Sequence, residues 1–290
     1  PAGLEAALTL ARARHRVTLA EAGAHFGGRV RHESSLRNLA AWGRVADYRL
    51  YQLGRMENVS LFAQSAMTAE TVAELAADHV LVATGARWLR SGRGRTHRTA
   101  IDGFADAALT PDDLFTGMAL APGLRVVIYD DDHDYLANAL AADLAAQGMH
   151  VELVSPMPSI AAWMGYTLEQ PRMLAELIDA GVGLHPNTVA RAWTRSGQGQ
   201  GSGLAVQRAD TGAERPVIEG DVLISVGLRE PDLALSEALH AAGIAHRVIG
   251  DAEAPGPIQS AVFSGHRHAR DVLGQEPEGG HFRRERPRLF

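Results

Sequence analysis

The sequence predicts an α/β protein made of two Rossmann-like units, with the second unit inserted into the first. A pattern of helix and buried strand near the start returns as a complete strand, helix and strand at residues 125–156. The length of 290 residues suffices for two domains of ordinary size. Because two more buried strands follow the repeat, we assign residues 1–100 and 222–290 to a split first unit and 101–221 to the second.

Composition narrows the classes of function. The formal net charge of −6 provides no clustered basic face for phosphates, so we expect no nucleic-acid partner. No apolar run reaches the roughly 20 residues that span a bilayer, and no signal peptide is visible, so we expect a cytoplasmic protein. The lack of cysteine excludes disulfides, thiolate catalysis and a cysteine-ligated iron–sulfur cluster within these residues.

The first half of the chain alternates helical and strand patterns. Apolar residues at helical spacing predict a helix at 2–13, and "RVTLAE", residues 16–21, is a short apolar strand that ends in an acid. A glycine-containing loop and a long helical stretch follow at residues 23–30 and 37–56. A second apolar strand, at residues 79–85, ends in Ala83-Thr84-Gly85. Because no strand precedes the first helix, we expect the sequence to be part of a longer polypeptide.

The second half begins with a connector at residues 86–122, which contains one short helix. Strands, helices and a meander follow. We expect strands at 125–130, 150–156, 221–230 and 247–255, helices at 134–148, 169–180 and 260–274, and a meander over 182–209 interrupted by a loop at 197–203. We expect the basic tail at 278–290 to be solvated and disordered.

Several short motifs stand where a dinucleotide fold binds its ligand. The N-terminus of the first helix favours a pyrophosphate, and Gly3 fits the last glycine of a G-x-G-x-x-G sequence. Glu21 ends the following strand, close to the spacing at which an acid binds ribose hydroxyls. Taken alone, Gly3 is explained equally well by close helix–strand packing, and Glu21 by a solvated strand end. Combined with Gly27-Gly28, Ala83-Thr84-Gly85 and Gly250-Asp251, the two residues indicate a dinucleotide-binding fold.

These motifs resemble the C-terminal half of the trimethylamine dehydrogenase family, which includes dimethylamine and histamine dehydrogenases and N-methyl amino acid demethylases. The resemblance rests on "PAGLEAA", "VTLAEA", "FGGRV", "LVATGARW" and "IGDAEAP", in this order, and covers nearly the whole chain. It implies two domains similar to the FAD and NAD(P) domains of glutathione reductase, joined in the family to an old-yellow-enzyme-like TIM barrel. The barrel, which carries FMN, a 4Fe-4S cluster and the amine site, is absent from this sequence.

The resemblance also implies that the first unit binds an adenine nucleotide, either ADP or FAD. It assigns no catalytic residue and no metal ligand to this chain. It implies a homodimer, the barrel as a fused or separate partner, and an electron-transferring flavoprotein as acceptor. The implied cofactor-binding residues are Pro1, Ala2 and Gly3 at the pyrophosphate, Glu21 and Ala22 at the ribose, Gly28 and Arg29 near the phosphates, Ala83, Thr84 and Gly85 along the cleft, and Asp251 at its far end.

An acidic turn argues against a second nucleotide site. Relatives that use NADPH, such as 2,4-dienoyl-CoA reductase, have a glycine-rich turn in the second unit, whereas this chain has "DDDHD" at residues 130–134. The side chains block the approach of a phosphate, and each carboxylate about 4 Å away repels it by roughly 1 to 4 kcal/mol. We therefore expect no NAD(P)H binding, and we expect the aspartates to cap the following helix; a divalent metal is the alternative.

The predicted function is the nucleotide-binding part of an FMN and iron–sulfur amine dehydrogenase or N-demethylase, whose barrel oxidises a C–N bond. Two alternatives remain open. One is an NAD(P)H-dependent flavin reductase of the 2,4-dienoyl-CoA reductase type, and the other is a nucleotide-binding subunit of a multi-chain demethylase. The sequence names neither the amine nor the choice between ADP and FAD.

Overall fold

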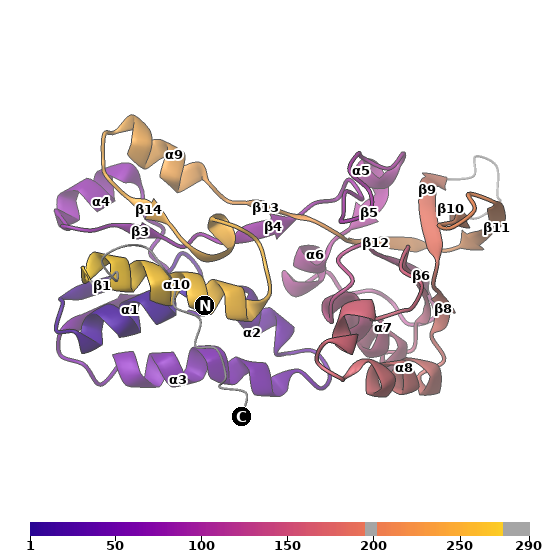
Figure 1. The fold of residues 1–290 in the computed structure, drawn as a ribbon, viewed down its shortest axis with the longest axis horizontal. Coiled ribbons are helices and arrows are strands. Elements are labelled where there is room, and N and C mark those ends of the chain that lie inside the picture. The colour runs from indigo at the N-terminus through magenta and orange to yellow at the C-terminus, as the bar shows by residue number, and fades with distance from the viewer. Residues whose placement is uncertain (195–201, 275–290) are drawn as a thin grey trace, which may run out of the picture. The chain divides into compact units, whose positions relative to one another are not determined.

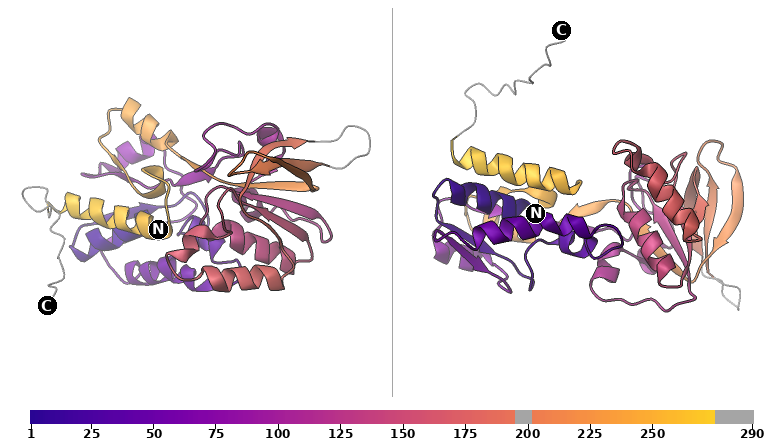
Figure 2. Two further views of the ribbon diagram at one scale, coloured as in Figure 1. Left: turned by 45° about the vertical axis from the view of Figure 1, so that its right-hand side comes forward. Right: turned by 90° about the horizontal axis from the view of Figure 1, so that it is seen from below.

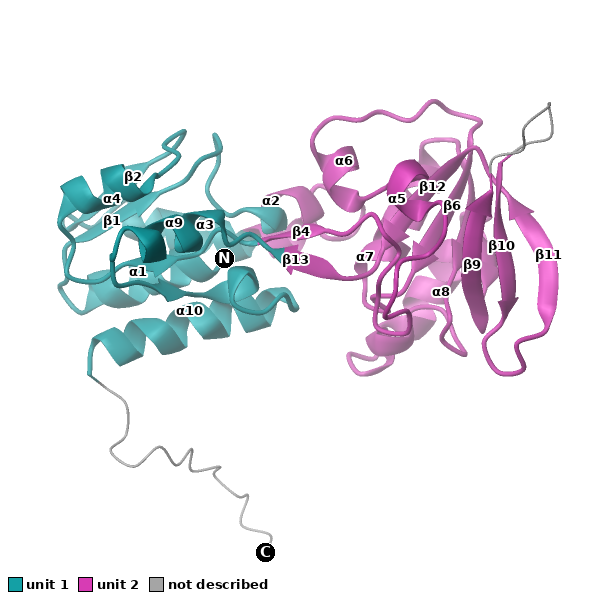
Figure 3. Cartoon of the chain, turned by 90° about the horizontal axis from the view of Figure 1, so that it is seen from above, with its two compact units in different colours: residues 1–30, 44–85, 231–290 teal, residues 31–43, 86–230 magenta. Residues whose placement is uncertain are grey.

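A computed structural model describes residues 1–194 and 202–274. The predicted tail at 278–290 and most of the predicted loop at 197–203 lie outside these residues. The chain divides into two compact units, coloured separately in Figure 3. Unit 1 contains residues 1–30, 44–85 and 231–290, and unit 2 contains residues 31–43 and 86–230.

Unit 1 combines helices with two parallel strand pairs (Figure 1). β1 (Val17–Ala20) pairs with β2 (Val59–Phe62), and β3 (Leu81–Val82) pairs with β14 (Arg247–Val248). Its helices are α1 (Ala2–Arg12), α3 (Arg44–Leu53), α4 (Ala69–Leu75), α9 (Ala234–Ala241), the 3-10 helix η3 (Gly250–Ala252) and α10 (Ile258–Val272), while α2 (Arg29–Glu33) contains the boundary between the units.

Close packing of α1 against α10 organises unit 1, and Figures 1 and 2 show the two helices side by side. Small residues face each other, so a Cβ atom on Gly265 would overlap the carbonyl oxygen of Ala2. Ala6, Ile249 and Ala261 join Ala2 in the same buried cluster. The alanine-rich sequence of α1 thus lets two helix backbones approach closely, as small residues do elsewhere.

Unit 2 is built on a five-stranded parallel sheet, in the order β5-β12-β6-β7-β8. A three-stranded antiparallel sheet, β11-β10-β9, adjoins it, and β4 pairs with β13 where the chain passes between the units. The strands are β4 (Ala86–Trp88), β5 (Ala108–Leu109), β6 (Arg125–Asp130), β7 (His150–Val154), β8 (Gly183–His185), β9 (Thr188–Thr194), β10 (Gly203–Arg208), β11 (Glu214–Glu219), β12 (Val222–Val226) and β13 (Arg229–Pro231). The helices are η1 (Ala40–Gly43), α5 (Phe104–Ala107), α6 (Pro111–Phe115), α7 (Leu136–Ala146), η2 (Ala162–Gly165) and α8 (Gln170–Asp179).

The central strand β6 is buried on both faces. Val126 and Ile128 belong to the core under α7 and α8, whereas Val127 and Tyr129 belong to the core under the antiparallel sheet. Side chains alternate between the faces of a strand, so a strand covered on both sides needs a continuous apolar run. This requirement explains the sequence "RVVIYD" and confirms the predicted α/β class with a parallel sheet.

The strand predicted at residues 79–85 is shorter in the structure, and a further short strand begins within the predicted connector. β3 ends at Val82 and β4 begins at Ala86, and Gly85 between them has φ of +85°. An extended strand cannot continue through a left-handed residue, so the backbone turns there. None of the helices within residues 1–194 and 202–274 has the length and apolar character needed to cross a bilayer.

The contact between α1 and α10 predicts that one glycine-to-alanine substitution destabilises the protein, which is the opposite of the usual effect inside a helix. Replacing a glycine inside a helix with alanine ordinarily stabilises a protein by about 0.5 to 1 kcal/mol. Gly265→Ala should instead lower the free energy of unfolding by about 1 to 3 kcal/mol, because its methyl group would overlap Ala2. Urea unfolding measures this change. Ser260→Ala, at an exposed position of α10, should stay within about 0.5 kcal/mol of the wild type.

Candidate functional site

All the predicted cofactor-binding residues fall in unit 1, at the N-terminus of α1, the end of β1, the start of α2, the loop after β3, and η3. A Cβ atom on Gly3 would lie 3.3 Å from that of Ala83. A Cβ atom on Gly250 would lie 2.5 Å from that of Ala2, which brings η3 to the same helix end. The structure therefore gathers segments from residues 1, 83 and 250 around the N-terminus of α1.

The N-terminus of α1 has no side-chain cap. The helix begins at Ala2, and the N–H of Glu5 donates to the carbonyl oxygen of Pro1 at 3.0 Å. The earlier N–H groups of a helix have no partner within it, and the helix dipole favours an anion beside them. An uncapped helix N-terminus that contains a glycine fits a bound phosphate group.

Glu21 lies directly after β1, at the carboxyl end of the strand. Its backbone N–H donates to Phe62 and its carbonyl oxygen accepts from Ser65, both at 2.8 Å, which fixes the residue between two strand ends. Its Oε1 atom accepts from the N–H of Gly23 at 2.9 Å. The half-buried carboxylate is thus held in place, and Ala22 beside it is exposed.

Two glycines present backbone that a ligand can approach. Gly28 has φ of +55° and Gly85 has φ of +85°, and in both cases no atom lies within 4 Å of where a Cβ would stand. Both conformations favour glycine. Thr84, next to Gly85, donates from Oγ1 to the carbonyl oxygen of Asp232 at 2.6 Å, so its side chain ties the loop after β3 to the segment before α9.

The remaining two predicted residues bind each other. Arg29 Nε donates to Asp251 Oδ2 at 2.7 Å, and Arg29 Nη2 donates to the carbonyl oxygen of Gly256 at 2.6 Å. Asp251 has an exposed fraction of only 8%. The sequence predicted both residues at the site, but it predicted neither their ion pair nor the hydrogen bond from Arg29 to Gly256. Both interactions join distant segments and have no local signal in the sequence.

The acidic turn of unit 2 does not cap α7, contrary to our prediction. The N-cap residue is Tyr135, which makes no side-chain capping bond. Asp130 Oδ1 accepts instead from the N–H groups of Asp132 and His133, at 3.2 and 2.9 Å, so it stabilises the turn itself. Asp134 Oδ1 accepts at 3.0 Å from the N–H of Tyr135, the residue before the helix, but no aspartate side chain accepts from an N–H group inside α7.

A second loop of unit 2, residues 93–97, packs onto the acidic turn. Asp131 accepts hydrogen bonds from the N–H groups of Thr96 and His97, and the N–H of Arg95 donates to its carbonyl oxygen at 3.0 Å. Arg95 also donates to Asp132 and lies over the ring of Trp163, 4.0 Å from its centre. The turn thus receives the Arg95 guanidinium and three backbone N–H groups from this loop in place of an external ligand.

Two glycines allow this loop its position. A Cβ atom on Gly94 would overlap the Asp131 side chain, and one on Gly227 would overlap the carbonyl oxygen of Arg93. In the sequence this segment is only part of the predicted connector at residues 86–122. Its glycines were the available signal, but they do not reveal which distant residue they approach.

Burial dominates the ionisation of the turn. Burial raises the pKa of Asp130 to about 7, and the nearby His133 opposes this only in part. Burial also acts to raise the pKa of Asp131, but hydrogen bonds from His133, His97 and Thr96 outweigh it and lower that pKa. Asp131 is therefore the anion that holds loop 93–97, while burial shifts Asp130 towards its protonated form.

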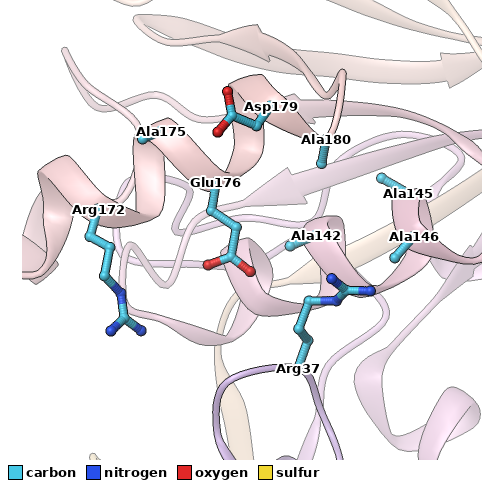
Figure 4. Close-up of a pocket in the computed structure, with 9 residues that line it drawn as sticks. All are labelled: Arg37, Ala142, Ala145, Ala146, Arg172, Ala175, Glu176, Asp179 and Ala180. Carbon is cyan, nitrogen blue, oxygen red and sulfur yellow. The ribbon is translucent and has the colours of Figure 1, made fainter.

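A metal site is not formed by the part of the chain that the structure describes. No group of three or more histidine and carboxylate side chains there could hold a metal ion. A pocket of about 520 Å³ lies in unit 2, between α7, α8 and the segment around Arg37 (Figure 4). Alanines form much of its wall, with Arg37, Arg172, Glu176 and Asp179 around it, and none of its residues is a predicted site residue.

Family models match two parts of the chain. Residues 109–197 match the OYE-like second alpha/beta domain, and residues 1–47 match the flavin containing amine oxidoreductase family. Dimethylamine dehydrogenase from Hyphomicrobium sp. (strain x) is 31% identical over 96% of this chain and 41% of its own length. The chain therefore spans about two fifths of the length of this curated relative.

Solved structures agree with these matches. Histamine dehydrogenase from Rhizobium sp. 4-9 is 37% identical, with a TM-score of 0.90 over 100% of this chain and 45% of that chain. 6-Hydroxypseudooxynicotine amine oxidase from Pseudomonas geniculata N1 is 36% identical, with a TM-score of 0.86 over 93% of this chain and 40% of that chain. Thioredoxin reductase from T. acidophilum is 15% identical, with a TM-score of 0.62 over 94% of both chains, and this likeness concerns the fold alone.

The raised pKa of Asp130 predicts how stability depends on pH. A group whose pKa is higher in the folded state stabilises the fold below its unfolded pKa, and this contribution disappears as pH rises through the folded pKa. The free energy of unfolding should therefore fall by up to about 1 kcal/mol per pH unit between about pH 4 and 7, and level off above 7. Urea unfolding of the wild type and Asp130→Asn at each pH isolates this contribution. Parallel pH profiles of the two proteins would contradict the assignment.

Proposed function

This chain corresponds to the C-terminal part of the trimethylamine dehydrogenase family, and we propose that its unit 1 holds an adenine nucleotide within a flavoprotein that oxidises a C–N bond. The substrate class would be a methylated amine or amino acid, as the names of the relatives suggest. FMN, a 4Fe-4S cluster and the amine site would belong to the rest of the protein. A flavoprotein would accept the electrons, and the protein would be a dimer.

The convergence of the predicted positions around the N-terminus of α1 is the observation that carries this proposal. The uncapped helix end and the open backbone at Gly28 and Gly85 suit a diphosphate. Glu21, at the end of β1, suits the hydroxyls of the adenosine ribose. A bound nucleotide would order the segments around the N-terminus of α1. Both ADP and FAD contain the diphosphate and the ribose that these residues would recognise.

The nested order of the units supports a further proposal. Unit 1 is formed by segments before and after unit 2 in the chain. We propose that the two are nested Rossmann-like domains, unit 1 binding the nucleotide and unit 2 no longer doing so. Loop 93–97 supports this loss of binding, because its N–H groups already satisfy Asp131 and its Arg95 already pairs with Asp132.

Denaturing the purified full-length protein and identifying the released nucleotides tests the proposal. We expect FMN together with ADP or FAD, and we expect no NADPH oxidation when NADPH is added to the native enzyme. Bound NADP, or bleaching of the flavin by NADPH, would favour the alternative flavin reductase. Release of FMN without any adenine nucleotide would contradict the role of unit 1.

Glu21→Gln should weaken adenine nucleotide binding by about tenfold or more, because a charge-assisted hydrogen bond to a ribose hydroxyl becomes a neutral one. Glutamine keeps an oxygen that can accept from Gly23, so the local turn should survive. Titration calorimetry on nucleotide-stripped protein measures the dissociation constant. Glu74→Gln removes the same charge from an exposed position on α4 and should leave binding unchanged. An equal loss in both variants would refute a specific ribose contact.

A further inference from the structure

We propose that residues 165–168 form a docking turn, which inserts the side chains of Tyr166 and Leu168 into an apolar surface on the part of the full-length protein outside this chain. The inference rests on the proposed function, because that proposal makes this chain one part of a longer polypeptide. The docking turn belongs to unit 2 and connects η2 with α8.

The docking turn exposes two large apolar side chains almost completely. Tyr166 is 87% exposed and Leu168 is 86% exposed, the highest values for large hydrophobic side chains within residues 1–194 and 202–274. A single exposed leucine is common on a protein surface. Two large apolar side chains that stand almost fully in water, two positions apart, favour an interaction site.

Hydrogen bonds hold the docking turn in one shape. The N–H of Tyr166 donates to the carbonyl oxygen of Trp163, and the hydroxyl of Thr167 donates to that of Met164, both at 3.1 Å. Met164 is buried in the core under α7 and α8, and the N–H of Trp163 donates to the carbonyl oxygen of His133 at 3.1 Å. The two apolar side chains thus extend from a fixed backbone, so little conformational entropy would be lost when they bind.

Leu168 adopts a backbone conformation that is unfavourable for leucine. Its φ of +62° lies in the left-handed region, where the Cβ atom is too close to the following carbonyl oxygen. Glycine or asparagine would adopt this conformation more easily. Strain of this kind persists at sites where a side chain has another role. The strain and the exposure of Leu168 together favour a role in which another surface buries its side chain.

The sequence around the docking turn is uncharged. Residues 153–168 contain no aspartate, glutamate, lysine, arginine or histidine. Glu169 follows them, and its Oε2 atom accepts from the hydroxyl of Thr167 at 2.8 Å. The centres of protein–protein interfaces are poor in charged residues and rich in tyrosine. A nucleic acid or a strongly charged protein would require charged side chains here, so the docking turn fits an apolar protein surface.

The lengths of the relatives indicate where such a surface would lie. This chain covers 41% of the length of dimethylamine dehydrogenase and 45% of the histamine dehydrogenase chain, so more than half of each relative lies outside the matched part. In a full-length protein of that size, the remaining region would be joined covalently to this chain. Its effective concentration would therefore exceed that of a second copy. We assign the apolar surface to the same polypeptide for this reason.

Hydroxyl-radical footprinting of the full-length protein tests whether the docking turn is covered. Mass spectrometry measures how fast each side chain is modified in the native protein relative to the unfolded protein. Tyr166 should be modified at least about fivefold more slowly in the native protein, because a covering surface excludes water. Tyr51, which is 61% exposed on α3, should be slowed by less than about twofold. Equal slowing of the two tyrosines would overturn the inference.

Leu168→Asn tests the second side chain of the docking turn. Asparagine suits the left-handed backbone, so in an uncovered turn this substitution would leave the modification of Tyr166 as it is. In a docked turn it removes one of two anchors, and the modification rate of Tyr166 should rise at least about threefold. Leu75→Asn makes the same change at a leucine of α4 that is 50% exposed, and it should leave that rate unchanged. The same rate in Leu168→Asn as in the wild type counts against the role of Leu168.

A photo-crosslinking side chain identifies the surface that covers the docking turn. Tyr166→p-benzoylphenylalanine in the full-length protein should form a crosslink within one polypeptide, to a residue outside the 290 residues of this chain. A crosslink to a second copy, to another protein or to this chain itself overturns the assignment, as does the lack of any crosslink.

The outcomes separate this inference from the proposed function. If the denatured protein releases no adenine nucleotide, the proposed function fails. If it releases one but Tyr166 is as accessible as Tyr51, only the docking turn fails. Should Leu168→Asn not fold, the footprint of the wild type still decides.

Discussion

The close approach of three backbone segments at Ala2 is the constraint on which unit 1 depends. Gly265 of α10 and Gly250 of η3 both meet this residue at distances that a side chain would prevent. Glycine is required at these two contacts for space, and at Gly250 also for its φ of +67°. Gly3 packs less closely, with 3.3 Å between an added Cβ and that of Ala83. Together they fix the N-terminus of α1 beside Asp251 and the loop after β3, so the position of the candidate site follows from packing.

The two units differ in how the polar and charged groups at the corresponding strand-to-helix turn find their partners. In unit 1 the N-terminal N–H groups of α1 receive no side-chain cap, and nearby glycines leave the backbone open. In unit 2 the turn after β6 carries carboxylates, and loop 93–97 supplies the N–H groups and the guanidinium that satisfy them. Electrostatic complementarity is met in both, by an external anion in the proposed first case and by the chain itself in the second.

Sequence reasoning located the elements more successfully than the contacts between them. The continuous apolar run of β6 and the regular spacing of α1 and α7 are local signals, and the structure confirms all three elements. The end of the strand before Gly85 was predicted to within three residues, but β4 was missed because a strand of three residues has no periodicity that the sequence could show. Helix capping by the aspartates was wrong because Asp130 accepts from N–H groups within the turn, and Asp131 accepts from Thr96 and His97, which lie more than 30 residues away in the chain. Long-range partners of this kind have no periodicity from which they could be predicted.

Loop 93–97 limits how the acidic turn can be altered. Its position depends on Gly94 and Gly227 as well as on Asp131 and Arg95, which occupy different segments of the chain. A redesign that made room for an anion at this turn would have to change several of these residues, and each single change would first leave a buried charge or a strained backbone behind. Single variants on that route would be less stable than the starting protein, so the turn can be converted only by several simultaneous substitutions.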